Sequence, residues 1–110
     1  MEQINRIQLK KEMNDLAHLS HKRESESELE KLLGKFQEWK NGKLDYDDLN
    51  GIILDTHDII GRNIWKAHDF DDDFIVIRAL YKNIITKEEL SPELYESLKG
   101  KIDALKKILG

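Results

Sequence analysis

Residues 74–81 read Phe74-Ile75-Val76-Ile77-Arg78-Ala79-Leu80-Tyr81, and this stretch decides the fold class. It is apolar on nearly every side, so its period alone does not separate a buried strand from a buried helix. A strand must pair with another strand, and no other segment of the chain has the composition of one. We therefore predict a buried central helix at 74–81 and an all-α fold.

The segment that follows carries two helix-start signals. Thr86 and Glu89 have the spacing of a capping box, in which the two side chains satisfy backbone N–H groups at the start of a helix. Ser91-Pro92 is a second signal, because proline at the first helical position loses no needed hydrogen bond. We expect a short capped turn and then a last helix with a core face formed by Leu94, Leu98, Ile102, Leu105 and Leu109.

The most regular apolar face of the chain lies upstream, and it predicts a second helix. Its residues recur every three or four positions, as on one side of an amphipathic helix, and Asn41-Gly42 provides a stop signal after them. We interpret this face as part of the core. Its members are Leu29, Leu32, Leu33, Phe36 and Trp39.

A polar segment at 21–27 separates this helix from an N-terminal one, expected from about Glu2 to His21. Ser25 precedes Glu28 with capping-box spacing, and Ser27 precedes Glu30 in the same way. The segment is either a loop or a solvated stretch of one longer helix, and we favour a break within residues 20–27.

The N-terminal helix is imperfectly amphipathic. Leu9, Met13 and Leu16 share one face with Ala17, whereas Ile4 and Ile7 point elsewhere. Two explanations stay open, namely fraying at a chain terminus and a second apolar face that contacts another molecule. Residues 1–24 are accordingly expected to be a loosely packed or partner-facing helix.

A third helix is predicted from the cap residue Asp45 onward. Its shared apolar face contains Leu49, Ile53, Ile60 and Ile64, and Gly61 favours a bend or an end. Together the segments predict one domain over residues 1–110, an antiparallel bundle of about five helices.

Composition limits the function classes. The 110 residues contain no cysteine, and no apolar run approaches the roughly 20 residues that cross a bilayer. Residues 44–73 hold nine Asp against only Arg62 and Lys66. This acidic segment favours a cationic partner or none, and no basic stripe for nucleic acid is present. We also expect a cytoplasmic protein with no membrane association.

The segment Arg62-Asn63-Ile64-Trp65-Lys66-Ala67-His68 resembles the Arg-x(4 to 6)-His motif of the HEPN nucleases, which are small helical domains, often dimeric, that cleave RNA without metal in several lineages. The resemblance implies that Arg62 stabilises phosphate charge and that His68 transfers protons. Phe70 stands where many relatives carry a tyrosine hydroxyl, and the match covers fewer than ten residues. A purely structural interpretation pairs Arg62 with Asp58 and places His68 at the negative end of a helix dipole.

A second resemblance covers more of the chain, from Phe36-x-x-Trp39-x-x-Gly42 to Ile84-Ile85-Thr86 and on to Leu94. In these residues the chain is similar to small uncharacterised bacterial proteins predicted to be helical. That resemblance implies a helical scaffold and no particular activity.

The cluster Asp69-Phe70-Asp71-Asp72-Asp73 begins like a calcium-binding EF-hand loop. Phe74 and Leu80 then stand where that loop needs Gly and Glu, so a helix cap is the better interpretation. His18 and His21 are one turn apart without an evident third ligand. We expect no metal and no cofactor.

Phe36, Trp39, Trp65, Phe70 and Phe74 are interpreted as core or core-edge residues. Because common enzyme signatures are absent, we favour a protein-binding or regulatory module over an enzyme. Its surface is expected to include Ile4, Ile7 and the carboxylates of Asp69, Asp71, Asp72 and Asp73, and it allows a homodimer. The alternatives are a metal-independent ribonuclease using Arg62 and His68, and an acidic antitoxin or immunity protein.

Overall fold

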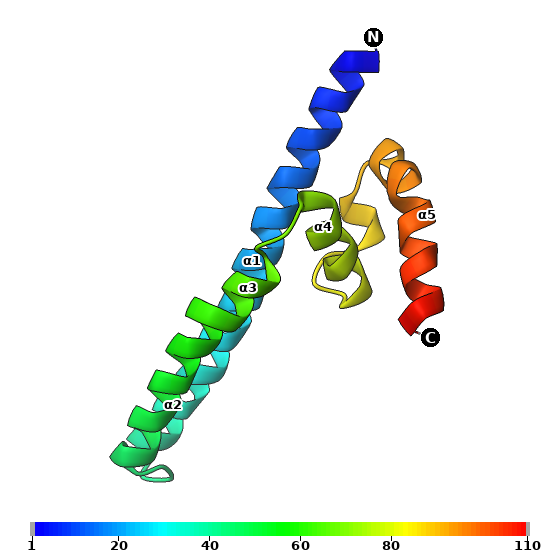
Figure 1. Cartoon of the computed structure of the whole chain (residues 1–110). Helices are drawn as coiled ribbons and strands as arrows, with labels where there is room; N and C mark the ends of the chain where they lie inside the picture. Colours follow the sequence, from blue (N-terminus) through cyan, green and yellow to red (C-terminus); the bar gives the residue numbers. More distant parts are fainter. Residues whose placement is uncertain (1, 110) are drawn as a thin grey trace. The chain divides into compact units, whose positions relative to one another are not determined.

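The computed structural model describes the backbone of residues 2–109 and the side chains of residues 6–108. Helix accounts for 84% of the chain, and the described residues contain no strand. The elements are α1 (Glu2–Lys40), α2 (Tyr46–Asp58), η1 (Ile59–Ile64), α3 (Trp65–Ala67), α4 (Asp72–Tyr81), η2 (Lys87–Glu89) and α5 (Pro92–Leu109). Since α2, η1 and α3 follow one another without a gap, the described chain has four helices (Figure 1). The all-α prediction is confirmed, and the expected number of about five helices is wrong.

Fewer helices are present than expected because the predicted break within residues 20–27 does not occur. Helix α1 continues through residues 20–27 and ends only at Lys40. Lys, Arg and Glu in this segment are good helix formers, and Lys22 lies 3.8 Å from Glu26 in an i,i+4 ion pair. The two capping-box spacings at Ser25 and Ser27 therefore lie inside a helix.

The second helix begins after a turn at residues 41–45. Gly42 adopts a φ of 74°, a conformation that glycine tolerates, and Asp45 is the extended residue before α2. The helix does not end at Gly61. It passes instead through the π-helical turn η1 and continues into α3.

The start signals downstream are confirmed. Thr86 and Glu89 form the capping box around η2, and α5 begins at Pro92. The Ser91 hydroxyl accepts the Leu94 N–H at 3.2 Å, and both Ser91 donors reach the Glu12 carboxylate, at 2.6 and 2.7 Å. Thus the Glu12 carboxylate of α1 binds Ser91, the residue that precedes α5.

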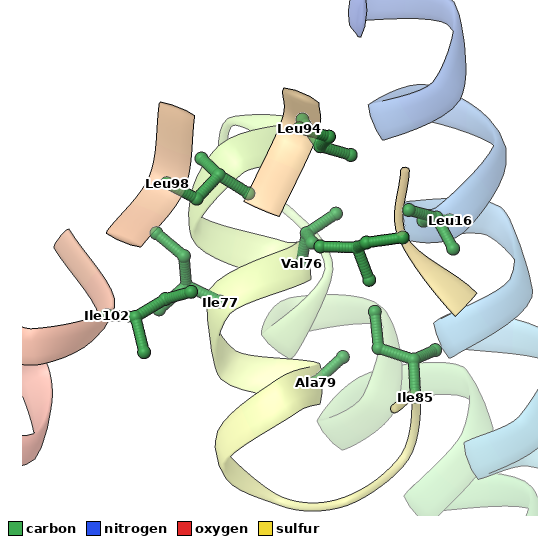
Figure 2. Close-up of a cluster of buried hydrophobic side chains, with 9 residues drawn as sticks. Leu16, Val76, Ile77, Ala79, Ile85, Leu94, Leu98 and Ile102 are labelled. Carbon is green, nitrogen blue, oxygen red and sulfur yellow. The ribbon is translucent and has the colours of Figure 1, made fainter. Parts of the chain in front are cut away.

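The chain separates into two compact units, and unit 1 contains residues 1–20 and 70–110. Its core is formed where α4 meets α5 and the first part of α1, as Figure 2 shows. The predicted central helix is buried through Ile75, Val76, Ile77 and Ala79. The other buried members of the cluster are Leu16, Ile85, Leu90, Leu94, Leu98 and Ile102.

Unit 2 contains residues 21–69 and has few buried side chains. Only Leu49, Thr56 and Ile64 are buried among its residues. The single domain expected over residues 1–110 stays a prediction. Within the described residues, no helix combines the length and the apolar character that crossing a bilayer requires.

The predicted core face at residues 29–39 is not part of a core. Its large side chains are substantially exposed: Leu29 is 50%, Leu33 58%, Phe36 39% and Trp39 47% exposed. Trp65, Phe70 and Phe74 are also exposed, so the interpretation of the aromatic residues as core residues is wrong, while a position at the edge of a core stays a prediction. Spacing shows that residues share a helix face, but it does not show what covers that face.

Candidate functional site

Arg62 and His68 lie at two different kinds of helical turn in unit 2. Arg62 belongs to the π-helical turn η1, and its side chain is exposed. His68 follows α3 as its C-terminal cap and is half-buried. The π turn is the only one in the part of the chain that the structure describes, and such turns are frequent at functional sites.

His68 is held by its own helix and by α1. The Nδ1 atom of its ring lies 2.8 Å from the Ile64 carbonyl oxygen. Its ring also meets the His21 ring edge to face, with centroids 5.1 Å apart and planes at 85°. Two imidazoles from distant parts of the sequence are thereby brought together, a contact that spacing along the chain does not reveal.

The Ile64 contact fixes which nitrogen of His68 carries a proton. A carbonyl oxygen only accepts, so Nδ1 must donate, and in the neutral ring Nε2 is then the basic nitrogen. The pairing of Arg62 with Asp58 was wrongly expected, because no ion pair joins them among the described side chains.

Two carboxylates of the acidic segment make defined contacts within unit 1. Asp72 accepts a hydrogen bond from the Asn14 amide at 3.3 Å. Asp73 lies 2.6 Å from the Lys101 ammonium and also accepts the Phe74 N–H at 2.8 Å. The hydrogen bond from Lys101 holds the pKa of the Asp73 carboxyl below its ordinary value, although partial burial opposes that effect.

The remaining two residues predicted to bind a partner are more accessible. Asp69 is exposed, and Asp71 is the exposed, extended residue that precedes α4. Asp71 makes no side-chain cap bond. The role of the four carboxylates in partner binding stays a prediction. No three His, Asp or Glu side chains come together as metal ligands within residues 6–108.

Unit 1 also contains a cavity of about 330 Å³ beside the α4–α5 connection. Its apolar wall includes Ile77, Ile85 and Ile102, and Lys87 at its edge lies 4.5 Å from the centre of the Tyr95 ring. This volume is at the lower end of small-molecule sites. Polar and charged side chains also line it, including Asn83, Glu88 and Lys106.

The strongest surface feature is the exposed face on the second half of α1. We call Leu29, Leu33, Phe36 and Trp39 the apolar stripe. Their spacing of four, three and three residues places them within about a third of the helix circumference. The sequence revealed the stripe, but it gave no signal that these side chains would remain exposed.

Two ion pairs lie on the same half of α1. Lys31 contacts Glu28 at 3.2 Å, and Lys35 contacts Glu38 at 3.0 Å. Both pairs join positions three residues apart on the helix surface.

No protein-family model matches the chain, and searches of curated proteins and of solved structures gave no significant match.

Proposed function

We propose that this chain is a protein-interaction module and that the apolar stripe is its binding surface. The observation that carries the proposal is the exposure of four large apolar side chains on one helix face. Single exposed apolar residues are normal on soluble proteins, whereas a contiguous group with a polar rim is typical of an interaction site.

The size of the stripe supports the same function. A large side chain presents roughly 200 Å² in total, so the four exposed fractions correspond to about 400 Å² of apolar surface. Burying that area is worth about 10 kcal/mol at 25 cal/mol per Å², before the cost of association is subtracted. Phe36 and Trp39 supply the aromatic anchors that interfaces favour.

Photo-crosslinking in cells tests this function. With benzoylphenylalanine in place of Leu33, we expect discrete protein adducts on irradiation. The matched control has the same group in place of Ile108, an apolar residue of α5 that is 79% exposed. Adducts from position 33 alone support the stripe as the binding surface. Equal adducts at both positions, or none at either, contradict it. An adduct with a cationic toxin would identify the chain as its antitoxin or immunity protein.

We further infer that unit 2 is an antiparallel helical hairpin. The turn at residues 41–45 joins α1 to α2 at one end, and the contact of His21 with His68 joins the same two helices at the other. The antiparallel bundle and the cytoplasmic location are proposed with it, the latter from the cysteine-free composition.

A second candidate function is metal-independent RNA cleavage by Arg62 and His68. The π turn at Arg62 and the defined tautomer of His68 support it. The test compares the wild-type chain with Arg62→Ala and His68→Ala on mixed RNA in chelator. Cleavage by the wild type, lost in both folded variants, supports the ribonuclease. Absence of cleavage by the wild type excludes it.

A further inference from the structure

We propose that the partner of the apolar stripe is a second copy of this chain, packed antiparallel about Leu33. This inference rests on the proposed function, because it names the occupant of the same surface. Three features of unit 2 favour a second copy, namely the charge balance of α1, the positions of Glu26 and Lys40, and the area of the stripe.

The charge balance of α1 gives no preference for a charged partner. Residues 21–40 contain five Lys or Arg and five Glu, so this half of the helix is neutral overall. Charges of both signs occur along it, and ion pairs join Glu28 with Lys31 and Lys35 with Glu38. A surface of mixed charge around an apolar centre is complementary to itself, whereas a strongly basic or acidic partner would gain little from it.

The positions of Glu26 and Lys40 define the arrangement. Each lies seven residues from Leu33, which is two helical turns, so the three residues share one face. In an antiparallel pairing about Leu33, Glu26 of one copy meets Lys40 of the other. A two-fold axis creates this contact twice, as an isologous interface requires.

The area of the stripe fits a homodimer. A stable interface buries about 800 Å² per partner, of which about 65% is apolar in homodimers, or roughly 500 Å². The apolar stripe provides about 400 Å² of this apolar area. The aliphatic stems of the Lys and Glu side chains beside it supply the remainder. Two helical hairpins joined in this way form a four-helix bundle, which buries the face that one hairpin leaves exposed.

The first experiment measures the mass of the full-length chain by sedimentation velocity between about 1 and 100 µM, a range that brackets ordinary homodimer affinities. We expect the wild type to have twice the mass of one chain. Leu33→Glu should be a monomer of unchanged helicity, because its side chain is exposed in the single chain. Ile108→Glu is the matched control and should remain a dimer. A wild type that is a monomer at every concentration overturns the proposal.

A charge-reversal series tests the antiparallel arrangement. Glu26→Lys and Lys40→Glu should each weaken the dimer about tenfold, because each change introduces like charges at both symmetric contacts. The double variant should recover wild-type affinity. Since Glu26 also pairs with Lys22 within its own helix, Lys22→Gln is the control and should leave the dimer unchanged. Additive losses in the double variant overturn the pairing of Glu26 with Lys40.

The two proposals fail differently. Crosslinks from position 33 to other proteins, together with a monomeric wild type, keep the interaction module and exclude the second copy. Absence of crosslinks together with a monomeric wild type excludes both. A crosslinked product with twice the mass of the chain supports both.

Discussion

At the scale of single residues, burial separates side chains that look alike in the sequence. Leu94 and Leu33 both belong to regular apolar faces, yet Leu94 is fully buried and Leu33 is mostly exposed. Leu94 packs in the cluster that includes Val76 and Leu98, where a lost side chain leaves a cavity. The two leucines should therefore differ in their effect on stability.

Leu94→Ala is expected to lower the free energy of unfolding by about 2 to 5 kcal/mol, the range for buried leucines. Leu29→Ala removes a side chain of the same size from the stripe and should cost much less in the monomer. Chemical denaturation monitored by circular dichroism measures both changes. Comparable losses, measured on monomeric chains, would contradict the assignment of the core to unit 1.

The ion pair of Asp73 with Lys101 should make the free energy of unfolding depend on pH in the acidic range. Since the pKa of Asp73 is lower in the folded chain than in the unfolded chain, its contribution is present above the ordinary pKa of about 4. It is lost as the pH falls through the lowered value. Asp73→Asn should remove this part of the pH dependence and, at neutral pH, cost at most about 1 kcal/mol, because the Lys101 side chain is mostly exposed to solvent. Unfolding midpoints measured from pH 7 to pH 2 on both proteins test this. Parallel curves would show that the ionisation of Asp73 adds nothing to the pH dependence of stability.

At the scale of helices and turns, the sequence predicted the local start and stop signals of helices, but it did not predict which side chains other helices cover. The stop at Gly42, the capping box at Thr86 and the start at Pro92 were predicted, because each depends on a few adjacent residues. The break at residues 20–27 was wrong, since serine and glutamate at capping-box spacing are also compatible with a helix interior. The contact of His21 with His68 joins residues 47 positions apart, so no local pattern could predict it.

Ser91 gives the sharpest test at this scale. Its hydroxyl accepts the Leu94 N–H and donates to Glu12, so Ser91→Ala removes the side-chain cap of the Leu94 N–H and one of the two hydrogen bonds to the Glu12 carboxylate. We expect a loss of about 1 to 2 kcal/mol in unfolding free energy, as for other removed helix caps. Ser97→Ala is a suitable control, because that hydroxyl contacts only a carbonyl within α5, at 2.8 Å. Equal effects of the two changes would show that the contact with Glu12 adds no stability.

At the scale of the whole molecule, the two units differ in how much apolar surface they bury. Unit 1 has a buried cluster built from three helices, whereas unit 2 buries only three side chains. Few buried contacts favour local opening of the backbone. The amides of unit 2 should therefore exchange with solvent faster than those of unit 1 in the monomer.

Hydrogen exchange at two protein concentrations checks this expectation. Protection in α4 should be independent of concentration, while protection in residues 21–40 should rise as the proposed dimer forms. Leu33→Glu serves as the monomeric reference and should show no rise. Uniform exchange across both units at every concentration would contradict the difference in burial.

The π turn at Ile59–Ile64 has a consequence for the length of the chain. Each of its hydrogen bonds encloses one residue more than a hydrogen bond of an α-helix. The continuous helix formed by α2, η1 and α3 therefore contains one residue more than a regular α-helix of the same length. Deleting Gly61 would let the turn close as ordinary α-helix while Trp65–Ala67 keep their orientation about the axis. A one-residue deletion elsewhere in this helix would rotate every later side chain by about 100°. The π turn is thus the position at which this helix can change its residue number without changing its faces.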